Sequence, residues 1–234
     1  MPELIVDKIS RTEKERVTLH EISFSMKKGE KIGLMGETGS GKTTLLKIIA
    51  GLVQPTTGLV NFQDKRVKGP DEVLLPGHPQ IGYLSQHFEL LNNYYVEEIL
   101  DMHNKTSDEA AQHLYKLCKI DHLLRRRTNE ISGGERQRIS LAKTLISNPS
   151  LLLLDEPFSN LDGINKKTIH QVLADIFNET SLTCIMVSHN PDELLSWADR
   201  LMILKEGKLI QMDEIQSVQS NPANSYVAQI IRKE

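Results

Sequence analysis

The feature that most limits what this chain can fold into is a glycine-rich octapeptide between a predicted strand and a predicted helix. Residues 36–43 read G-E-T-G-S-G-K-T and match the pattern G-x-x-x-x-G-K-[ST]. Residues 31–35 before it form a short apolar run, and residues 43–51 after it carry apolar side chains at helical spacing and end on a glycine. This context indicates a phosphate-binding loop rather than a chance glycine-rich turn.

The residue types of this phosphate loop (residues 36–43) suit the binding of a nucleoside triphosphate. Glycines let backbone N–H groups close around phosphate oxygens, and the helix that follows adds its positive end. We expect Lys42 to reach the β- and γ-phosphates and the Thr43 hydroxyl to ligate Mg²⁺. The predicted nucleotide-binding residues here are Gly36, Glu37, Thr38, Gly39, Ser40, Gly41, Lys42, Thr43 and Thr44.

A second acidic motif follows a continuous apolar run at residues 150–154. Such a run is typical of a strand buried on both faces, and ligands bind at the ends of such strands. Asp155 is suited to hold Mg²⁺, and Glu156 is suited to accept a proton from an attacking water. The alternative is a solvated acidic turn, which the phosphate loop upstream makes the weaker interpretation.

The order of strand and helix patterns predicts the fold class. Strands that alternate with helices favour a mainly parallel α/β sheet, and the early alternating segments favour a small antiparallel β layer beside it. Residues 87–147 are mostly helical in pattern and predict an α-helical lobe. The predicted strands are residues 4–9, 17–26, 31–35, 58–62, 150–155 and 183–188, with a hairpin of 201–204 and 208–212 turned at Glu206–Gly207. Asn190 and Pro191 are the expected N-cap and first residue of a helix after the strand at 183–188.

Composition excludes several classes of protein. The chain has 234 residues and a net charge of −3, so we expect no nucleic-acid partner bound through bulk charge. No apolar run is long enough for a membrane helix, and the first residues do not resemble a signal peptide. Any membrane-spanning part would therefore come from another chain. The two cysteines, Cys118 and Cys184, lie in apolar stretches and are expected to be packing residues.

A third motif begins the helix predicted after residue 132. Ser132 and Glu135 have the spacing of a capping box. Gly133 and Gly134 lie between them, although each glycine costs a helix about 1 kcal/mol relative to alanine. They are explained if a phosphate approaches the backbone at the helix start, whereas the plainer interpretation is only a well-capped helix.

Taken together, these motifs resemble the ATP-binding cassette (ABC) family. The resemblance rests on GETGSGKTT, ISGGERQRISLAKTL, LLLLDEP and SNLD, with Gln86 and His189, and it covers essentially the whole chain in the family's order. It implies a P-loop (RecA-like) fold within a single nucleotide-binding domain. Residues 1–86 and 148–234 would form the catalytic α/β core, and residues 87–147 the helical subdomain with the signature motif.

The resemblance also implies roles for single residues. Family members bind ATP and Mg²⁺ between two cassettes arranged head to tail. Ser132, Gly133, Gly134 and Glu135 would then touch the γ-phosphate held by Lys42 of a second cassette. Gln86 would contact Mg²⁺ or the attacking water, Glu156 would be the general base, and His189 the switch histidine. In SNLD, residues 159–162, Asp162 would lie at the interface between cassettes.

The sequence departs from the family pattern in two places. The family usually stacks an aromatic residue on adenine upstream of the phosphate loop, but residues 9–14 (ISRTEK) contain none, and Arg11 is the available substitute. Base selectivity is therefore an open question. Ile131 and Glu135 also stand where the family commonly has leucine and glutamine. Because Glu135 keeps the capping box, we expect the signature to function.

The resemblance implies an ATPase subunit of an importer-like transporter, at the cytoplasmic face of the membrane and docked on separate permease subunits. Its second cassette would be identical or different. Residues 87–100 are the expected permease seat, although their apolar residues Phe88, Leu90, Leu91, Tyr94 and Tyr95 would equally suit the core of the helical lobe. The alternative function is a cassette ATPase acting on a cytosolic partner such as cluster-assembly machinery. A non-hydrolysing nucleotide-binding module or a small-molecule kinase fits the motifs less well.

Overall fold

The computed structural model describes residues 2–159 and 161–232, and the chain divides into two compact units. The first unit covers residues 1–78, 153–155 and 183–234, and the second covers residues 79–152 and 156–182. These units differ from the predicted core and helical subdomain, whose boundaries stay a prediction. Over the described residues, no helix combines the length and apolarity needed to cross a membrane.

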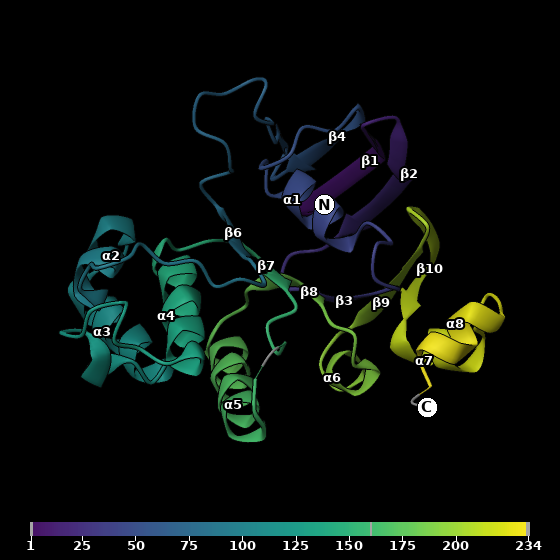
Figure 1. The fold of residues 1–234 in the computed structure, drawn as a ribbon. Helices are drawn as coiled ribbons and strands as arrows, with labels where there is room; N and C mark the ends of the chain where they lie inside the picture. The colour runs from purple at the N-terminus through teal and green to yellow at the C-terminus, as the bar shows by residue number, and fades with distance from the viewer. Residues whose placement is uncertain (1, 160, 233–234) are drawn as a thin grey trace. The chain divides into compact units, whose positions relative to one another are not determined.

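The first unit contains an antiparallel sheet near the N-terminus (Figure 1). Its strand order is β2 (Arg16–Met26), β1 (Leu4–Glu13), β4 (Thr57–Phe62) and β5 (Lys65–Arg66). Leu4 and Val6 of β1 are buried as their alternation predicts, and Ile9 is buried too because the register shifts between Val6 and Ile9. The small antiparallel layer expected from the sequence is therefore confirmed.

The first unit also holds the mainly parallel part of the fold. Its strand order is β10 (Lys208–Glu214), β9 (Arg200–Lys205), β3 (Lys31–Met35) and β8 (Thr183–Val187), followed by the last residues of β7 (Leu151–Asp155). β3 pairs parallel with β8 and β9, whereas β9 and β10 form an antiparallel hairpin at the predicted Glu206–Gly207 turn. The helices are α1 (Lys42–Ile49), α6 (Pro191–Leu195), α7 (Ile215–Ser220) and α8 (Ser225–Ile230).

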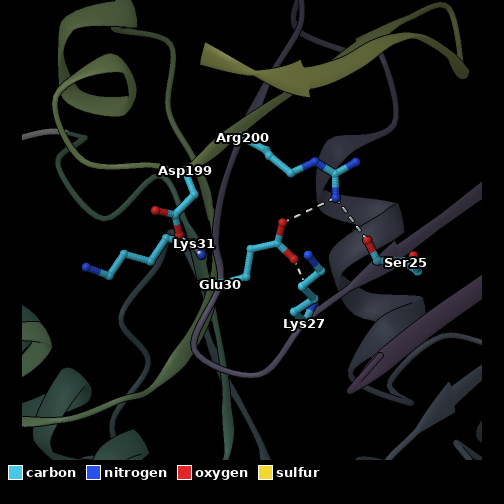
Figure 2. Close-up of polar contacts among 6 residues, drawn as sticks. All are labelled: Ser25, Lys27, Glu30, Lys31, Asp199 and Arg200. Atoms are coloured by element: carbon cyan, nitrogen blue, oxygen red, sulfur yellow. Dashed lines mark hydrogen bonds and ion pairs between the residues drawn. The ribbon is translucent and has the colours of Figure 1, made fainter. Parts of the chain in front are cut away.

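A polar cluster fixes the turn between β2 and β3 against the start of β9 (Figure 2). The Glu30 carboxylate accepts the backbone N–H of Lys27 at 2.6 Å and pairs with the Arg200 guanidinium at 3.3 Å. Arg200 also donates to the carbonyl of Ser25, and Asp199 accepts the backbone N–H of Lys31 at 2.8 Å. These contacts hold the amino ends of β3 and β9, the ends remote from the phosphate loop.

The second unit is built around its helices. It contains β6 (Ile81–Leu84), α2 (Val96–His103), α3 (Asp108–Leu117), the short 3₁₀ turn η1 (Asp121–Leu123), α4 (Gly133–Ile146) and α5 (Gly163–Glu179). α4 lies close to β6, where a Cβ at Gly82 would come within 2.7 Å of Thr144. Glycine is needed there because the helix approaches the strand backbone closely.

Residues 87–147 are mostly helical, as predicted, through α2, α3, η1 and α4. Residues 88–94 contain no helix, and α2 begins at Val96. The positive φ angles of Phe88 (47°) and Asn93 (64°) are incompatible with a continuous right-handed helix. This segment is therefore a loop with several large side chains.

Both cysteines are buried packing residues, as predicted. Desolvation raises the pKa of the Cys118 thiol to about 12, and it also raises the pKa of the Cys184 thiol well above its ordinary value.

The strands β7 and β8 are buried along their whole length. The predicted α/β architecture with a parallel sheet is thus the observed one.

Candidate functional site

The phosphate loop follows directly from the carboxyl end of β3. Gly36, Gly39 and Gly41 have φ angles of 152°, 82° and 97°, a region that favours glycine. A Cβ at residue 36 would lie 2.3 Å from the carbonyl oxygen of Leu204, so no larger residue fits this position. The loop sequence therefore matches the backbone conformation that it must adopt.

Lys42 is folded back onto its own loop. Its side chain is 5% exposed, and its ammonium donates to the carbonyl oxygens of Gly36 at 2.7 Å and Glu37 at 2.8 Å. α1 begins at Lys42, and its N-cap residue Gly41 has a left-handed backbone and supplies no side-chain cap. The first N–H groups of α1 are thus left without a side-chain acceptor, as an anion site at a helix start requires.

Two oxygen ligands suited to a divalent cation lie beside this loop within the same unit. The Thr43 hydroxyl is 3.2 Å from a carboxylate oxygen of Asp155, at the end of β7. A hydroxyl and a carboxylate are oxygen donors of the kind that Mg²⁺ prefers. The buried Ser40 hydroxyl has no hydrogen-bond partner among the described residues, which fits a loop that receives phosphate oxygens.

A cavity of about 1070 Å³ adjoins the phosphate loop. Residues 11–14, 16–18 and 20, residues 37–40 and residues 206–208 line it. None of these lining residues, all within the described part of the chain, is phenylalanine, tyrosine or tryptophan. Arg11, the expected substitute for a stacking ring, donates to the carbonyl of Gln54 at 2.8 Å and pairs with Glu13 at 3.2 Å.

His189 is an exposed residue directly after β8. Asn190 is the N-cap of α6 and Pro191 occupies its first turn, as the sequence predicts. The preceding Ser188 hydroxyl donates to the carboxylate of Glu193, a buried contact that fixes the chain between β8 and α6. The imidazole is therefore carried at the carboxyl end of a buried parallel strand.

In the second unit, Gln86 and Glu156 lie together. The Gln86 side-chain amide donates to the Glu156 carboxylate at 3.1 Å. Glu156 has φ = 52°, which costs an L-residue backbone strain and is a frequent property of functional sites. Although 70 positions separate them, the family resemblance assigns both residues to the attacking water; the hydrogen bond between them is a detail that no local pattern predicts.

The signature helix α4 starts with the predicted capping box. The Ser132 hydroxyl accepts the N–H of Glu135 at 3.3 Å, and the Glu135 carboxylate accepts the N–H of Ser132 at 2.7 Å. This backbone hydrogen bond lowers the pKa of Glu135. The capping box is confirmed.

The two glycines of the signature differ in their surroundings. A Cβ at Gly134 would meet the side-chain oxygen of Asn165 at 2.3 Å, so packing against α5 explains this glycine. A Cβ at Gly133 would have nothing within 4 Å. Close packing within the chain therefore explains Gly134 but not Gly133. The predicted reason for a glycine, close approach of a phosphate to the backbone, applies to Gly133 alone.

The SNLD loop ends at the start of α5. Asp162 is the N-cap of this helix, and its carboxylate accepts hydrogen bonds from the N–H groups of Ile164 and Asn165 at 3.0 and 2.8 Å. The hydrogen bond from the Asn165 backbone is the main cause that lowers the pKa of Asp162. Asn160 lies outside the described residues. Asn165, which touches both Gly134 and Asp162, was missed in the sequence, where a helical asparagine carries no distinctive signal.

The proposed permease segment presents large side chains to solvent. Leu91, Tyr94 and Tyr95 are 50%, 40% and 37% exposed, so they do not form the core of the helical lobe. Their backbone is nevertheless fixed, because Thr128 donates to the carbonyls of Leu91 and Tyr94 at 2.7 and 3.0 Å. Arg127 is the last of the three consecutive exposed arginines at residues 125–127. Its guanidinium lies over the Tyr95 ring, 4.6 Å from the ring centre.

Comparison with known proteins places these motifs in one family. Residues 19–159 match the ABC transporter family. The chain is 33% identical to the glucose import ATP-binding protein GlcV of Saccharolobus solfataricus, over 99% of this chain and 68% of that protein. It is 35% identical to the sulfate/thiosulfate import ATP-binding protein CysA of Bacillus cereus, over 89% of this chain and 60% of that protein.

A third relative is an Fe(3+) ions import ATP-binding protein, FbpC 2 of Haemophilus influenzae, at 35% identity over 94% of this chain and 64% of that protein. The chain thus spans about two thirds of the length of these relatives. CbiO1 of Clostridium perfringens, part of the ABC transporter complex CbiONQ, shares the fold with a TM-score of 0.79 at 24% identity, covering 95% of this chain and 92% of that one. The chain belongs to the ABC transporter family and carries its ATP-binding ATPase domain.

Proposed function

We propose that this chain hydrolyses Mg-ATP to energise import through separate permease subunits. Binding of Mg-ATP is supported by the arrangement at the carboxyl end of β3, where Lys42 is buried among loop carbonyls and Thr43 lies beside Asp155. The transport part is supported by the relatives, whose names describe ATP-binding proteins of importers. The chain would therefore act at the cytoplasmic face of a membrane.

The phosphate loop would bind the triphosphate through its backbone N–H groups, the Ser40 hydroxyl and the Lys42 ammonium. The Lys42 ammonium, kept in place by the Gly36 carbonyl, would also donate to phosphate oxygens, and such charge-assisted hydrogen bonds are strong. Thr43 and Asp155 would hold Mg²⁺, which supplies charge neutralisation at the β- and γ-phosphates when bound. A role of Gln86 at the metal is what the family resemblance implies. With no phenylalanine, tyrosine or tryptophan among the described residues that line the adjoining cavity, most of the binding energy would come from the phosphates rather than the base.

Glu156 would act as the general base for the attacking water. Its place directly after Asp155 puts a proton acceptor next in the chain to a carboxylate suited to the metal. Gln86, at 3.1 Å, would hold the Glu156 carboxylate in place. His189 would contribute a hydrogen bond at the γ-phosphate, as the resemblance to the family implies.

A second cassette would complete each site. Ser132, Gly133, Gly134, Glu135 and Asp162 would face the nucleotide bound by the other copy in a head-to-tail pair. The exposed backbone at Gly133, with open space where a side chain would be, supports this role.

The first test is Glu156→Gln, studied by light scattering and by phosphate release. Loss of the base should lower turnover by about 10²- to 10⁴-fold. The variant should then change from monomer to dimer when Mg-ATP is added, because bound ATP is no longer consumed. Glu179→Gln, at the exposed end of α5, is the matched control and should behave like the wild type.

A Glu156→Gln variant that hydrolyses ATP at the wild-type rate would remove this residue as the base. A loss of turnover without a dimer would instead indicate that the second cassette is a different chain or that a permease is required.

The exposed segment with Leu91, Tyr94 and Tyr95 supports a partner that offers an apolar cytoplasmic helix. Purification from detergent-solubilised membranes should recover a membrane protein with the wild-type chain, and Tyr94→Asp with Tyr95→Asp should lose it. The isolated double variant should keep its ATPase activity. If only cytosolic proteins bind, the alternative of a cassette ATPase acting on a cytosolic partner is favoured.

A further inference from the structure

Tyr226, on the last described helix, reaches the phosphate loop. Its phenol oxygen accepts the backbone N–H of Glu37 at 3.2 Å and donates to the carbonyl oxygen of Leu204 at 3.3 Å. α8 is held at its start by Asn224, whose side chain caps the N–H of Val227 at 3.0 Å. All of these residues belong to the first unit. A segment 189 positions away in the sequence thus contacts the nucleotide-binding loop directly.

The contact falls on the same peptide group that holds Lys42. The N–H of Glu37 and the carbonyl of Gly36 form one planar peptide unit. Tyr226 accepts from the N–H side of this unit, and the Lys42 ammonium donates to the carbonyl side at 2.7 Å. Because the unit is rigid, fixing its N–H also fixes the direction of its carbonyl toward Lys42.

This peptide needs an external support. Gly36 has φ = 152°, and a glycine imposes little restriction of its own on the orientation of its peptide groups. Residue 36 cannot be larger, because a Cβ would lie 2.3 Å from the Leu204 carbonyl oxygen. The same carbonyl oxygen accepts the hydrogen bond of Tyr226. The phenol therefore supplies the restraint that the glycine lacks.

Tyr226 is itself well placed to provide this restraint. Its side chain is half-buried, and the Lys205 ammonium lies 4.4 Å from the centre of its ring. A phenol is protonated at neutral pH, and burial raises the pKa of Tyr226 further, so its hydroxyl can donate to Leu204.

We propose that Tyr226 is a positioning residue for Lys42, acting through the Gly36–Glu37 peptide to hold the phosphate loop ready for the nucleotide. The proposal rests on the proposed function, since Lys42 is taken to bind the triphosphate. The hydroxyl of Tyr226 improves nucleotide binding and leaves the chemical step unchanged. The C-terminal helix α8 is thereby part of the nucleotide site.

The test is Tyr226→Phe in the full chain, which removes only the hydroxyl. Loss of the hydroxyl, with its hydrogen bonds to Glu37 and Leu204, should raise KM for Mg-ATP, and the dissociation constant for Mg-ADP, by about 3- to 10-fold. The value of kcat should stay within about twofold. Tyr226→Leu, which also removes the ring, should raise KM at least as much.

Two control variants separate positioning from general effects on the fold. Tyr115→Phe removes the hydroxyl of a buried tyrosine on α3, and Lys205→Met removes the ring's cation but leaves the Tyr226 hydroxyl; both should keep the wild-type KM. An unchanged KM in Tyr226→Phe, or a fall in kcat alone, would overturn the proposal. A wild-type chain that hydrolyses no nucleoside triphosphate would instead refute the proposed function.

Discussion

The starts of α1 and α4 are both glycine-rich, yet the protein treats them in opposite ways. At α1, the N-cap is Gly41 and no side chain accepts from the first turn. At α4, the N-cap is Ser132, and a complete capping box supplies acceptors for the N–H groups of Ser132 and Glu135 from within the chain. An uncapped helix start leaves all of its first N–H groups and its partial positive charge for a ligand, whereas a capping box has already satisfied part of them.

The two starts therefore suit different parts of one reaction. α1 can bind an anion through many backbone groups and through Lys42, whose side chain is 5% exposed. The capping box fixes the start of α4, and under the proposed function this start would offer a second cassette the hydroxyl of Ser132 and the open backbone of Gly133. Binding strength should depend on α1, and completion of the site on α4.

The largest effect is expected at α1 from Lys42→Ala. Removing the ammonium eliminates charge-assisted hydrogen bonds to the phosphates, so the affinity for Mg-ATP should fall by about 100-fold or more. Equilibrium titration with a fluorescent ATP analogue measures this directly. Lys47→Ala, near the other end of the same helix, is the control and should bind normally. Unchanged affinity in Lys42→Ala would mean that the octapeptide is not the phosphate site.

The next largest effect concerns the backbone before α1. Gly36→Ala places a Cβ 2.3 Å from the Leu204 carbonyl oxygen and 2.6 Å from the Ser40 hydroxyl. We expect the free energy of unfolding to fall by about 2–3 kcal/mol, from strain and overpacking together. Gly39→Ala, which has open space around the new methyl group, should cost only about 1 kcal/mol. Equal losses in chemical denaturation of the two variants would contradict this account of the loop.

The smallest effect on stability is expected at α4 from Ser132→Ala. Loss of an N-cap serine should cost about 1 kcal/mol, or roughly 2–4 °C in melting temperature for a chain of this size. Ser107→Ala removes the N-cap serine of α3 and should cost the same. Only Ser132→Ala should also weaken ATP-dependent dimer formation in the Glu156→Gln background. If the two serine variants dimerise equally well, α4 is merely a well-capped helix.

The sequence was sufficient where local pattern decides the structure. The phosphate loop, the capping box at Ser132 and the Asn190–Pro191 helix start follow from short-range rules, and all have the predicted local structure. The sequence was insufficient where distant segments meet. The contacts of Gln86 with Glu156, Asn165 with Gly134, and Tyr226 with Glu37 join residues that no periodicity relates.

The loop at residues 88–94 also depends on distant contacts. Its backbone is fixed by hydrogen bonds from Thr128, which no local pattern predicts. The helix α8 did have a usable signal, because Asn224 precedes a run of apolar residues and is a good N-cap. That signal predicts a helix but says nothing of what its tyrosine contacts.

The burial of both thiols has a practical consequence for site-specific labelling of this protein with a fluorescent dye. Cys118, with a pKa of about 12, and the fully buried Cys184 should be inert to maleimides at neutral pH. A single cysteine introduced on the surface, for example Gly163→Cys beside the SNLD loop, would then be the one site that takes a dye. Opening and closing of a cassette pair could be recorded by fluorescence without first removing any native residue.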